Sequence, residues 1–163
     1  MFAVAAPSAA AKPEAYAELL AQARALLAGE RDFTANAANL SALLFHGLEG
    51  LNWAGFYWLK GGELVLGPFQ GKPACVRIAL GKGVCGTAAA LRRTQVVPDV
   101  HAFPGHIACD SASNSEVVVP VLAEGRLVGV LDLDSPRLAR FDDADARGLE
   151  AIVAAFLECT DLP

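Results

Sequence analysis

The sequence predicts an α+β fold, in which a mostly antiparallel central sheet has the N- and C-terminal helices packed on one face. Two amphipathic helical segments open the chain and another closes it. Between them, segments with high β-propensity are separated by glycine-containing turns, as in antiparallel hairpins. Helices before and after a run of strands, with one short helix inserted among them, indicate helices packed on a sheet.

The longer helices are predicted from the spacing of their apolar residues and from their ends. Leucines and alanines recur at three- and four-residue intervals from Lys12 to Gly29, and Gly29 is a suitable end for this first helix. Residues 34–48 repeat the pattern with a stripe of leucines. Asp142 is expected to cap the last helix, whose first turn carries further acidic residues that favour its positive end.

The remaining elements are strands and one short helix. Aromatic and β-branched residues mark the strands, and glycine or proline marks their ends. Strands are expected at residues 53–59, 63–66, 76–80, 95–97, 117–122 and 127–134, and the short helix at residues 84–92.

The turn between the last two strands decides which side chains share a face of the sheet. A three-residue loop at 123–125 would place Gly125 at the left-handed position of a type I turn with a G1 bulge. A two-residue loop would instead point Glu116 away from Asp132, since a one-residue slip reverses every side chain. A bulge beside Pro120 would also change the count. The three-residue loop is expected, and it pairs Leu122 with Arg126, Glu116 with Asp132 and Asn114 with Asp134.

Length and composition limit the classes of function. The 163 residues predict one domain, and the net charge of −5 argues against nucleic acid as a partner. No apolar run reaches the roughly 18 residues of a membrane span. Residues 1–12 are expected to be a loosely ordered lead-in, without the positive start of a signal peptide, before a domain at residues 13–163. A cytoplasmic location is expected, so the four cysteines should be reduced, catalytic or metal-bound.

Cysteines supply the first candidates for chemistry. Cys109 lies in the polar loop at residues 105–116, where serines, an asparagine and carboxylates favour accessibility over burial as a small apolar residue. Cys85 stands at the start of the short helix, where the helix dipole and free backbone N–H groups favour a thiolate. Cys75 precedes a strand, and Cys159 lies on the apolar stripe of the last helix and is assigned to the core.

Zinc is the competing use of cysteine and histidine. The intervals between Cys75, Cys85 and Cys109 are not the short spacings of structural zinc sites. His101 and His106 could still approach Cys109 in space. No metal is predicted.

Carboxylates supply the second group of candidates. Strand alternation puts Asp132 and Asp134 on one face, and Glu116 begins the partner strand. Carboxylates gathered on an otherwise apolar sheet should have raised pKa values, which suits a general acid at neutral pH. The alternative is strand-end charges that point to water, and for Asp134 it is a reasonable one.

Trp53 and Tyr57 lie on one face of the first strand and would form an aromatic wall. Such a pair belongs to a core more often than to a pocket, but a methyl-sulfur group would bind well against it.

Several segments together resemble the free methionine-(R)-sulfoxide reductases, enzymes built on a single GAF domain. The resemblance covers nearly the whole chain after the first dozen residues. It is carried by residues 52–57, 67–75, 81–88, 106–110, 113–116 and 129–135, which include three cysteines and three carboxylates.

The resemblance implies a single GAF-like catalytic domain and a set of roles. Cys109 would be the catalytic cysteine, and Cys75 and Cys85 would be candidates to resolve its oxidised form. The active-site carboxylates would be Glu116, Asp132 and Asp134, and Trp53 would cover the methyl group of the substrate. Tyr57, the second residue of the aromatic wall, is a further candidate for substrate binding.

The same resemblance implies free methionine-(R)-sulfoxide as the substrate, thioredoxin as the reductant and a homodimer, with no cofactor. The alternative is a GAF-type module that binds a small ligand or senses redox state through its thiols without turnover.

Overall fold

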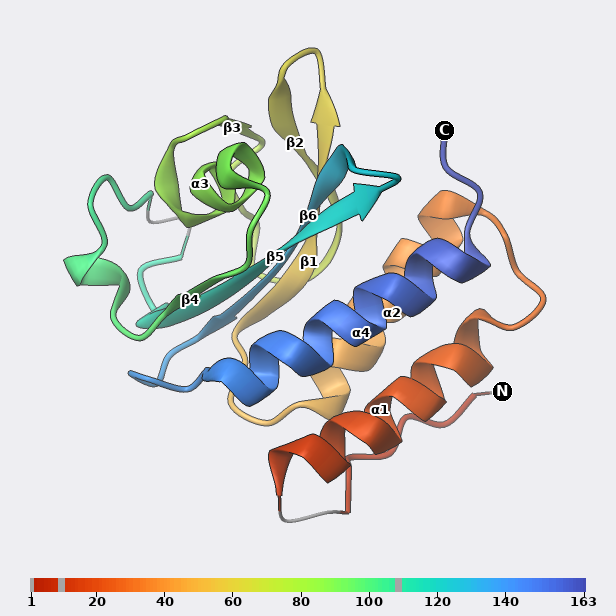
Figure 1. The fold of residues 1–163 in the computed structure, drawn as a ribbon. Helices are drawn as coiled ribbons and strands as arrows, with labels where there is room; N and C mark the ends of the chain where they lie inside the picture. The colour runs from red at the N-terminus through yellow and green to blue at the C-terminus, as the bar shows by residue number, and fades with distance from the viewer. Residues whose placement is uncertain (1, 9–10, 108–109) are drawn as a thin grey trace.

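A six-stranded antiparallel sheet forms the centre of the computed structural model, which describes residues 2–8, 11–107 and 110–163 (Figure 1). Its strand order is β3-β2-β1-β6-β5-β4, so strands from both halves of the chain meet in the middle as β1 and β6. The strands are β1 (Trp53–Lys60), β2 (Glu63–Gly71), β3 (Arg77–Ala79), β4 (Gln95–Val97), β5 (Ser115–Ala123) and β6 (Arg126–Ser135).

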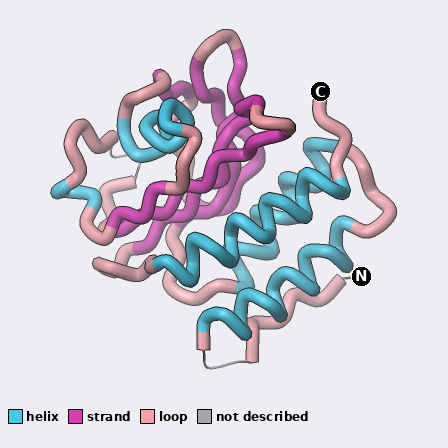
Figure 2. The backbone as a smooth tube through the Cα atoms, viewed as in Figure 1, coloured by secondary structure: helices cyan, strands magenta, loops and turns pink. Residues whose placement is uncertain are grey.

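Helices cover both faces of this sheet (Figures 1 and 2). Helices α2 (Phe33–Gly47) and α4 (Asp143–Cys159) pack on one face, and α1 (Lys12–Leu27) packs mainly on α4. Helix α3 (Gly83–Leu91) lies on the opposite face. The predicted fold class is confirmed, with the N- and C-terminal helices on one side. The sequence did not indicate the 3-10 turn at Val100–Ala102 or the extension of β2 to Gly71.

Strand alternation divides the core between the two faces. On β1, Phe56 belongs to the helix-side core and Tyr57 to the core beneath α3. The same split separates Leu131 from Val130 on β6. Successive residues of a strand point to opposite faces, so the apolar segments read from the sequence supply two cores at once. The second, smaller core adjoins the polar residues described below.

Polar contacts join α1 to the start of α4. Asp142 caps α4 as expected, in a capping box with Asp145. The buried Asp145 carboxylate accepts a hydrogen bond from the Tyr16 hydroxyl at 2.9 Å and contacts Lys12 and Arg140. These contacts link α1 to the start of α4, and removing one partner would leave a buried charge uncompensated.

The segment before α1 also contacts that helix. Ala5 exchanges two hydrogen bonds with the Gln22 side chain, and Ser8 donates to Glu18. None of the helices in the described ranges combines the length and apolarity needed to cross a membrane.

The β5–β6 hairpin differs from the prediction in its turn. Ala123 pairs with Arg126, so the loop is the two-residue Glu124-Gly125, and the predicted three-residue loop is wrong. Both loop residues have positive φ, 51° and 76°, as a type I′ turn requires. An extra residue in β6, Val128, then forms a bulge that shifts the register.

The two-residue loop alone would have turned Glu116 to the opposite face from Asp132, and the bulge returns it to the same face. Glu116 pairs with Asp134, and Val118 pairs with Asp132. The predicted pairings of Glu116 with Asp132 and of Asn114 with Asp134 are therefore wrong by two residues. The prediction that Glu116 and Asp132 share one face of the sheet is confirmed.

Candidate active site

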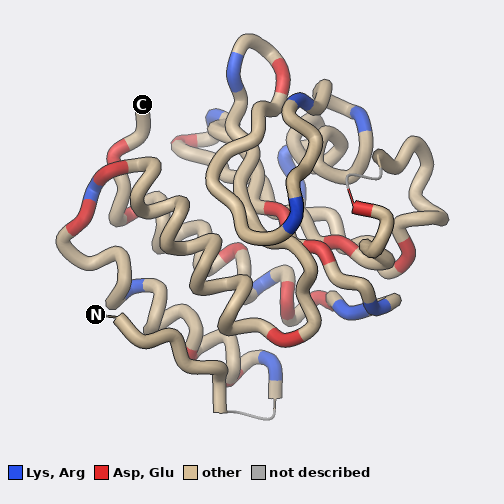
Figure 3. Tube along the Cα trace, turned by 180° about the vertical axis from the view of Figure 1, so that it is seen from behind, with Lys and Arg blue, Asp and Glu red and all other residues tan. Residues whose placement is uncertain are grey.

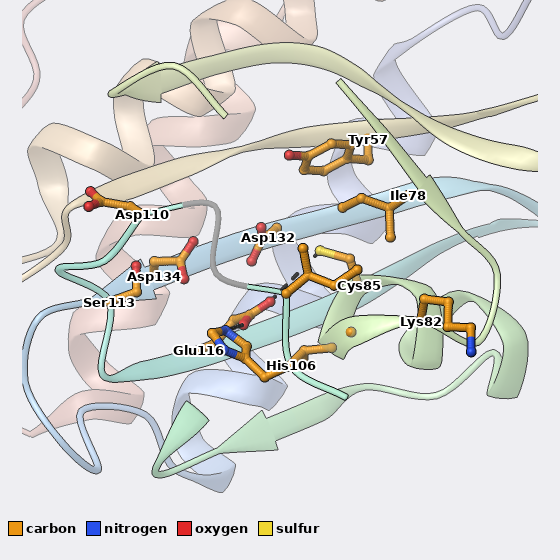
Figure 4. Close-up of a pocket in the computed structure, with 13 residues that line it drawn as sticks. Tyr57, Ile78, Lys82, Cys85, His106, Asp110, Ser113, Glu116, Asp132 and Asp134 are labelled. Atoms are coloured by element: carbon orange, nitrogen blue, oxygen red, sulfur yellow. Dashed lines mark hydrogen bonds and ion pairs between the residues drawn. The ribbon is translucent and has the colours of Figure 1, made fainter. Parts of the chain in front are cut away.

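Three carboxylates from adjacent strands meet on the α3 face of the sheet, at the edge of the smaller core (Figure 4). Glu116 on β5 is paired with Asp134 on β6, and Asp132 lies two residues along the same strand. They line a cavity on this face of the sheet. The other lining residues are Tyr57, Ile78, Lys82, Gly83, Val84, Cys85, His106, Ile107, Asp110 and Ser113.

Glu116 is buried and has a contact on each of its two carboxylate oxygens. Its side chain accepts a hydrogen bond from the Cys85 thiol at 3.8 Å on Oε1, and its Oε2 lies 3.8 Å from His106 Nε2. Burial raises its pKa well above the usual value, and the nearby charges of Asp132 and Asp134 add to the effect. His106 contributes little positive charge, because burial and His101 lower its pKa.

Both aspartates are also pushed toward their protonated forms. Burial and the neighbouring Asp134 raise the pKa of Asp132 well above its usual value, and only 5% of Asp132 is exposed. Burial raises the pKa of Asp134 to about 7, although a hydrogen bond from Ser113 opposes the shift. Asp134 lines the cavity and does not point freely into water. The expected raised pKa values are therefore supported, and the cluster can hold protons at neutral pH.

Cys85 corrects one expectation of the sequence analysis. It lies at the start of α3, but it is 4% exposed and its thiol faces Glu116 and Asp132. Burial and these two carboxylates raise the pKa of Cys85 well above its usual value. A helix dipole favours the thiolate only modestly, so it is outweighed here, and the prediction of a thiolate at this position is wrong.

The cysteines differ in their covalent state. Cys75 is disulfide-bonded, whereas Cys85 and Cys159 are free thiols. Cys159 is partly buried against the helix-side core, close to its predicted place. Cys109, the predicted catalytic cysteine, lies outside the described residues.

The predicted aromatic wall is present beside the carboxylates. Trp53 and Tyr57 stack with ring centroids 5.8 Å apart, and Trp53 also stacks on Phe69 at 5.2 Å. The two polar ends donate hydrogen bonds to one neighbouring segment, Trp53 Nε1 to the Lys72 carbonyl at 3.2 Å and the Tyr57 hydroxyl to the Cys75 carbonyl at 3.0 Å. The wall therefore also holds the backbone that carries the disulfide-bonded cysteine.

A glycine makes room for this arrangement. Gly55 lies between the two aromatic residues on β1 and is paired with Asp132 across the strands. A Cβ atom at Gly55 would be 2.3 Å from the Phe69 Cβ and 2.8 Å from the Trp53 ring. The missing side chain lets the Trp53 ring and Phe69 close over this point of the sheet.

Comparison with known proteins assigns the family. Residues 34–156 match the model described as GAF domain. The free methionine-R-sulfoxide reductase of Escherichia coli is 56% identical over 88% of this chain and 87% of that protein. The chain belongs to the free methionine-R-sulfoxide reductase family. The enzyme of that name from Saccharomyces cerevisiae is 45% identical over 86% of this chain and 83% of its own length.

A solved structure of the same family agrees with the fold. The free methionine-R-sulfoxide reductase from Neisseria meningitidis, in complex with its substrate, superposes with a TM-score of 0.93. It is 46% identical and covers 98% of this chain and 95% of that one. The resemblance found in the sequence is confirmed, and the GAF fold is the scaffold of an enzyme.

A second polar group, formed by Asp110, Asn52 and Ser113 beside the carboxylates, was not predicted from the sequence. Asp110 accepts hydrogen bonds from the Ala112 amide at 2.9 Å and from Asn52 at 3.1 Å. These bonds lower the pKa of Asp110, as does the nearby Lys72. Asn52 also donates to Ser113, at 3.0 Å. The sequence indicated this group only through the location of its residues: Asp110 and Ser113 lie in the polar loop, and Asn52 is the first residue of a segment that resembles the family.

The site therefore combines opposite electrostatic tendencies within one cavity. Three carboxyl groups favour protonation, while Asp110 at the cavity wall stays ionised. Separated pKa values of this kind are typical of acid–base sites. A cluster of Cys85, Glu116 and Asp132 also brings one potential metal ligand atom from each residue within 4.8 Å of the others.

Proposed function

We propose that this chain reduces free L-methionine-(R)-sulfoxide to methionine through cysteine sulfenic acid and disulfide chemistry. One observation carries the proposal beyond family membership: buried carboxyl groups with raised pKa values line a hollow together with an aromatic wall, beside a disulfide-bonded cysteine. An enzyme that cleaves a sulfur–oxygen bond needs a proton donor, a place for the methyl-sulfur group and a thiol pair, and these residues supply candidates for each.

Cys109 is proposed as the nucleophile. Its thiolate attacks the sulfoxide sulfur, the sulfoxide oxygen takes up protons, and methionine leaves as Cys109 becomes a sulfenic acid. A second thiol condenses with the sulfenic acid to form a disulfide and releases water. One sulfoxide is thereby reduced and two thiols are oxidised, so atoms and electrons balance without a cofactor.

The carboxyl cluster is proposed as the source of the proton. An oxide ion is a poor leaving group, so protonation of the oxygen must accompany attack. Glu116 and Asp132 are the stronger candidates, because both are buried and burial raises the pKa of each well above its usual value. Asp134, with a pKa of about 7, can pass protons to them or bind the substrate amino group.

Cys75 is favoured over Cys85 as the resolving cysteine. Cys75 is disulfide-bonded, and Tyr57 holds its carbonyl beside the aromatic wall. Cys85 is a free, buried thiol that donates to Glu116, and its raised pKa disfavours the thiolate needed for exchange. Cys85 remains a candidate for substrate positioning.

Trp53 and Tyr57 are proposed to bind the methyl-sulfur end of the substrate. Their stacked rings form the apolar side of a second hollow that they share with Asp110, Asp132 and Asp134. Sulfur groups interact favourably with aromatic rings, and the carboxylates on the other side would receive the polar end of the amino acid.

Thioredoxin as reductant, a homodimeric state and a cytoplasmic location complete the proposal. Thioredoxin would reduce the disulfide by thiol–disulfide exchange. Family resemblance supports the first two, and the free thiols Cys85 and Cys159 are in keeping with a reducing compartment.

The test is turnover with separated substrates. Thioredoxin-coupled consumption of NADPH should occur with free methionine-(R)-sulfoxide and not with the S epimer or with methionine sulfoxide in a peptide. The competing function is a GAF-type sensor that binds a small ligand or switches through its thiols. Such a sensor would bind methionine sulfoxide without consuming it, and stoichiometric binding without methionine release would overturn the proposal.

A further inference from the structure

Cys85 is a buried thiol that the proposed reaction does not use as a nucleophile. It points into the carboxylate cluster, with its sulfur 3.8 Å from Glu116 Oε1 (Figure 4). Asp132 completes a group of three buried side chains whose donor atoms all lie within 4.8 Å of one another. One soft sulfur and two carboxylate oxygens at this spacing are ligands for a borderline cation.

An unpaired oxygen also points to a cation here. Asp132 is 5% exposed and lines the cavity, yet its Oδ1 has no hydrogen-bond partner among the described residues. In the same described ranges, no lysine or arginine forms an ion pair with Glu116 or Asp132, and His106 is the one basic side chain that contacts Glu116. Charged residues of both signs are distributed over the rest of the fold (Figure 3). A buried polar atom without a partner is costly, and a positive ligand would satisfy it.

The spacing agrees with a tetrahedral ion. Two ligands on one tetrahedral zinc, with zinc–sulfur and zinc–oxygen bonds of about 2.3 and 2.0 Å, lie about 3.5 Å apart. The Cys85 sulfur and the Glu116 oxygen are 3.8 Å apart, so this pair needs a shift of a few tenths of an ångström. The donor atoms of all three residues lie within 4.8 Å of one another, so closing on one ion requires movements of up to about 1.3 Å. Magnesium and calcium prefer oxygen ligands alone, and a thiolate disfavours them.

We propose that Cys85, Glu116 and Asp132 form a Zn²⁺-binding site within the cavity. His106, whose Nε2 is 3.8 Å from the second Glu116 oxygen, would orient that ligand from outside the coordination sphere. Bound zinc would occupy the proposed proton donors and inhibit reduction. This inhibition rests on the proposed function, whereas zinc binding itself does not.

Cobalt provides a direct probe, because Co²⁺ replaces zinc and a bound thiolate gives a charge-transfer band in the near ultraviolet. The full-length protein, reduced with a phosphine that is then removed, is titrated with Co²⁺. We expect a saturable band at one metal per chain that Zn²⁺ abolishes. Cys85→Ser should lose the band, whereas Cys159→Ser, a free cysteine far along α4, and Cys109→Ser should keep it.

Two further variants keep the thiol and test the other residues. Glu116→Gln removes one ligand charge at constant shape and should weaken Co²⁺ binding at least about tenfold, and His106→Gln should weaken it by about 10- to 100-fold. Far-ultraviolet circular dichroism monitors folding of each variant. A band that persists in Cys85→Ser, a band lost in Cys109→Ser alone, or no band at all would overturn the site.

The outcome separates this proposal from the proposed function. Zinc should also inhibit turnover of the wild-type enzyme, reversibly on addition of a chelator. A cobalt band with the expected dependence on Cys85, but without inhibition by zinc, would support the metal site and contradict the placement of catalysis at these carboxylates.

Discussion

Replacement of Asp134 by asparagine tests whether burial really holds the carboxyl cluster protonated. The pKa of Asp134 rises from its ordinary value of 3.8 to about 7, mainly by burial. The native state therefore binds a proton that the unfolded chain has released at neutral pH. When the pKa of a carboxyl group is higher in the native state than in the unfolded chain, its contribution to stability is complete below the pKa of the unfolded chain. That contribution is lost as the pH rises through the pKa of the native state.

The magnitude follows from these two values. One pKa unit corresponds to about 1.4 kcal/mol, so a carboxyl with these native and unfolded pKa values loses about 2 kcal/mol of stabilisation between about pH 5.5 and 8. Asp134 also raises the pKa values of Glu116 and Asp132, which adds to the effect in the same direction. Wild-type stability should fall over this range relative to Asp134→Asn.

Urea unfolding followed by fluorescence at several pH values measures the difference. Loss of the Ser113 hydrogen bond shifts the variant by a constant amount, so only the change with pH is informative. Asp161→Asn is the matched control: a hydrogen bond from Arg31 lowers the pKa of Asp161, so its contribution is complete across this range and its difference from wild type should not vary. A pH-independent difference for Asp134→Asn would refute the argument for a protonated cluster.

Three further predictions concern the cysteines, the aromatic wall and the sheet. Cys109→Ser should abolish methionine release, whereas Cys75→Ser should permit one turnover per chain and then stop. The amount of methionine released in a reaction without reductant distinguishes the two variants. Multiple turnovers by Cys109→Ser would rule out Cys109 as the nucleophile. Tyr57→Phe removes the hydrogen bond to the Cys75 carbonyl, worth about 1 kcal/mol, and should slow disulfide formation about fivefold in thiol-trapping experiments; an unchanged rate would show that this bond does not position Cys75. Gly55→Ala would force its Cβ against Phe69 and should lower the free energy of unfolding by about 1–3 kcal/mol, and an unaltered urea midpoint would contradict that.

The hairpin that carries the carboxylates shows how far the sequence could predict the site. Alternation along β6 placed Asp132 and Asp134 together, and the fold class followed from the order of helices and strands. The loop length did not follow, because Glu124 adopts a left-handed conformation that glutamate rarely takes. The predicted three-residue loop, which lacks the Val128 bulge, and the observed two-residue loop with that bulge both leave Glu116 on the aspartate face. The face was therefore predictable, whereas the pairing partner was not.

The state of Cys85 could not be predicted for a different reason. Its position at a helix start is a local property and favoured a thiolate. Its burial against Glu116 and Asp132 depends on α3 packing over β5 and β6, segments distant in the sequence. Local patterns located the candidate residues, and only tertiary packing fixed their protonation.

The hydrogen bonds of the aromatic wall have a consequence for attempts to redesign this enzyme. Trp53 and Tyr57 line the hollow that they share with the aspartates, while their polar edges donate hydrogen bonds to the carbonyls of Lys72 and Cys75. Mutations chosen there to admit a bulkier sulfoxide would also loosen the backbone around Cys75 and alter regeneration between turnovers. Selectivity would be better varied at Ile78 or Ile107, which line the cavity from other segments and leave that backbone untouched.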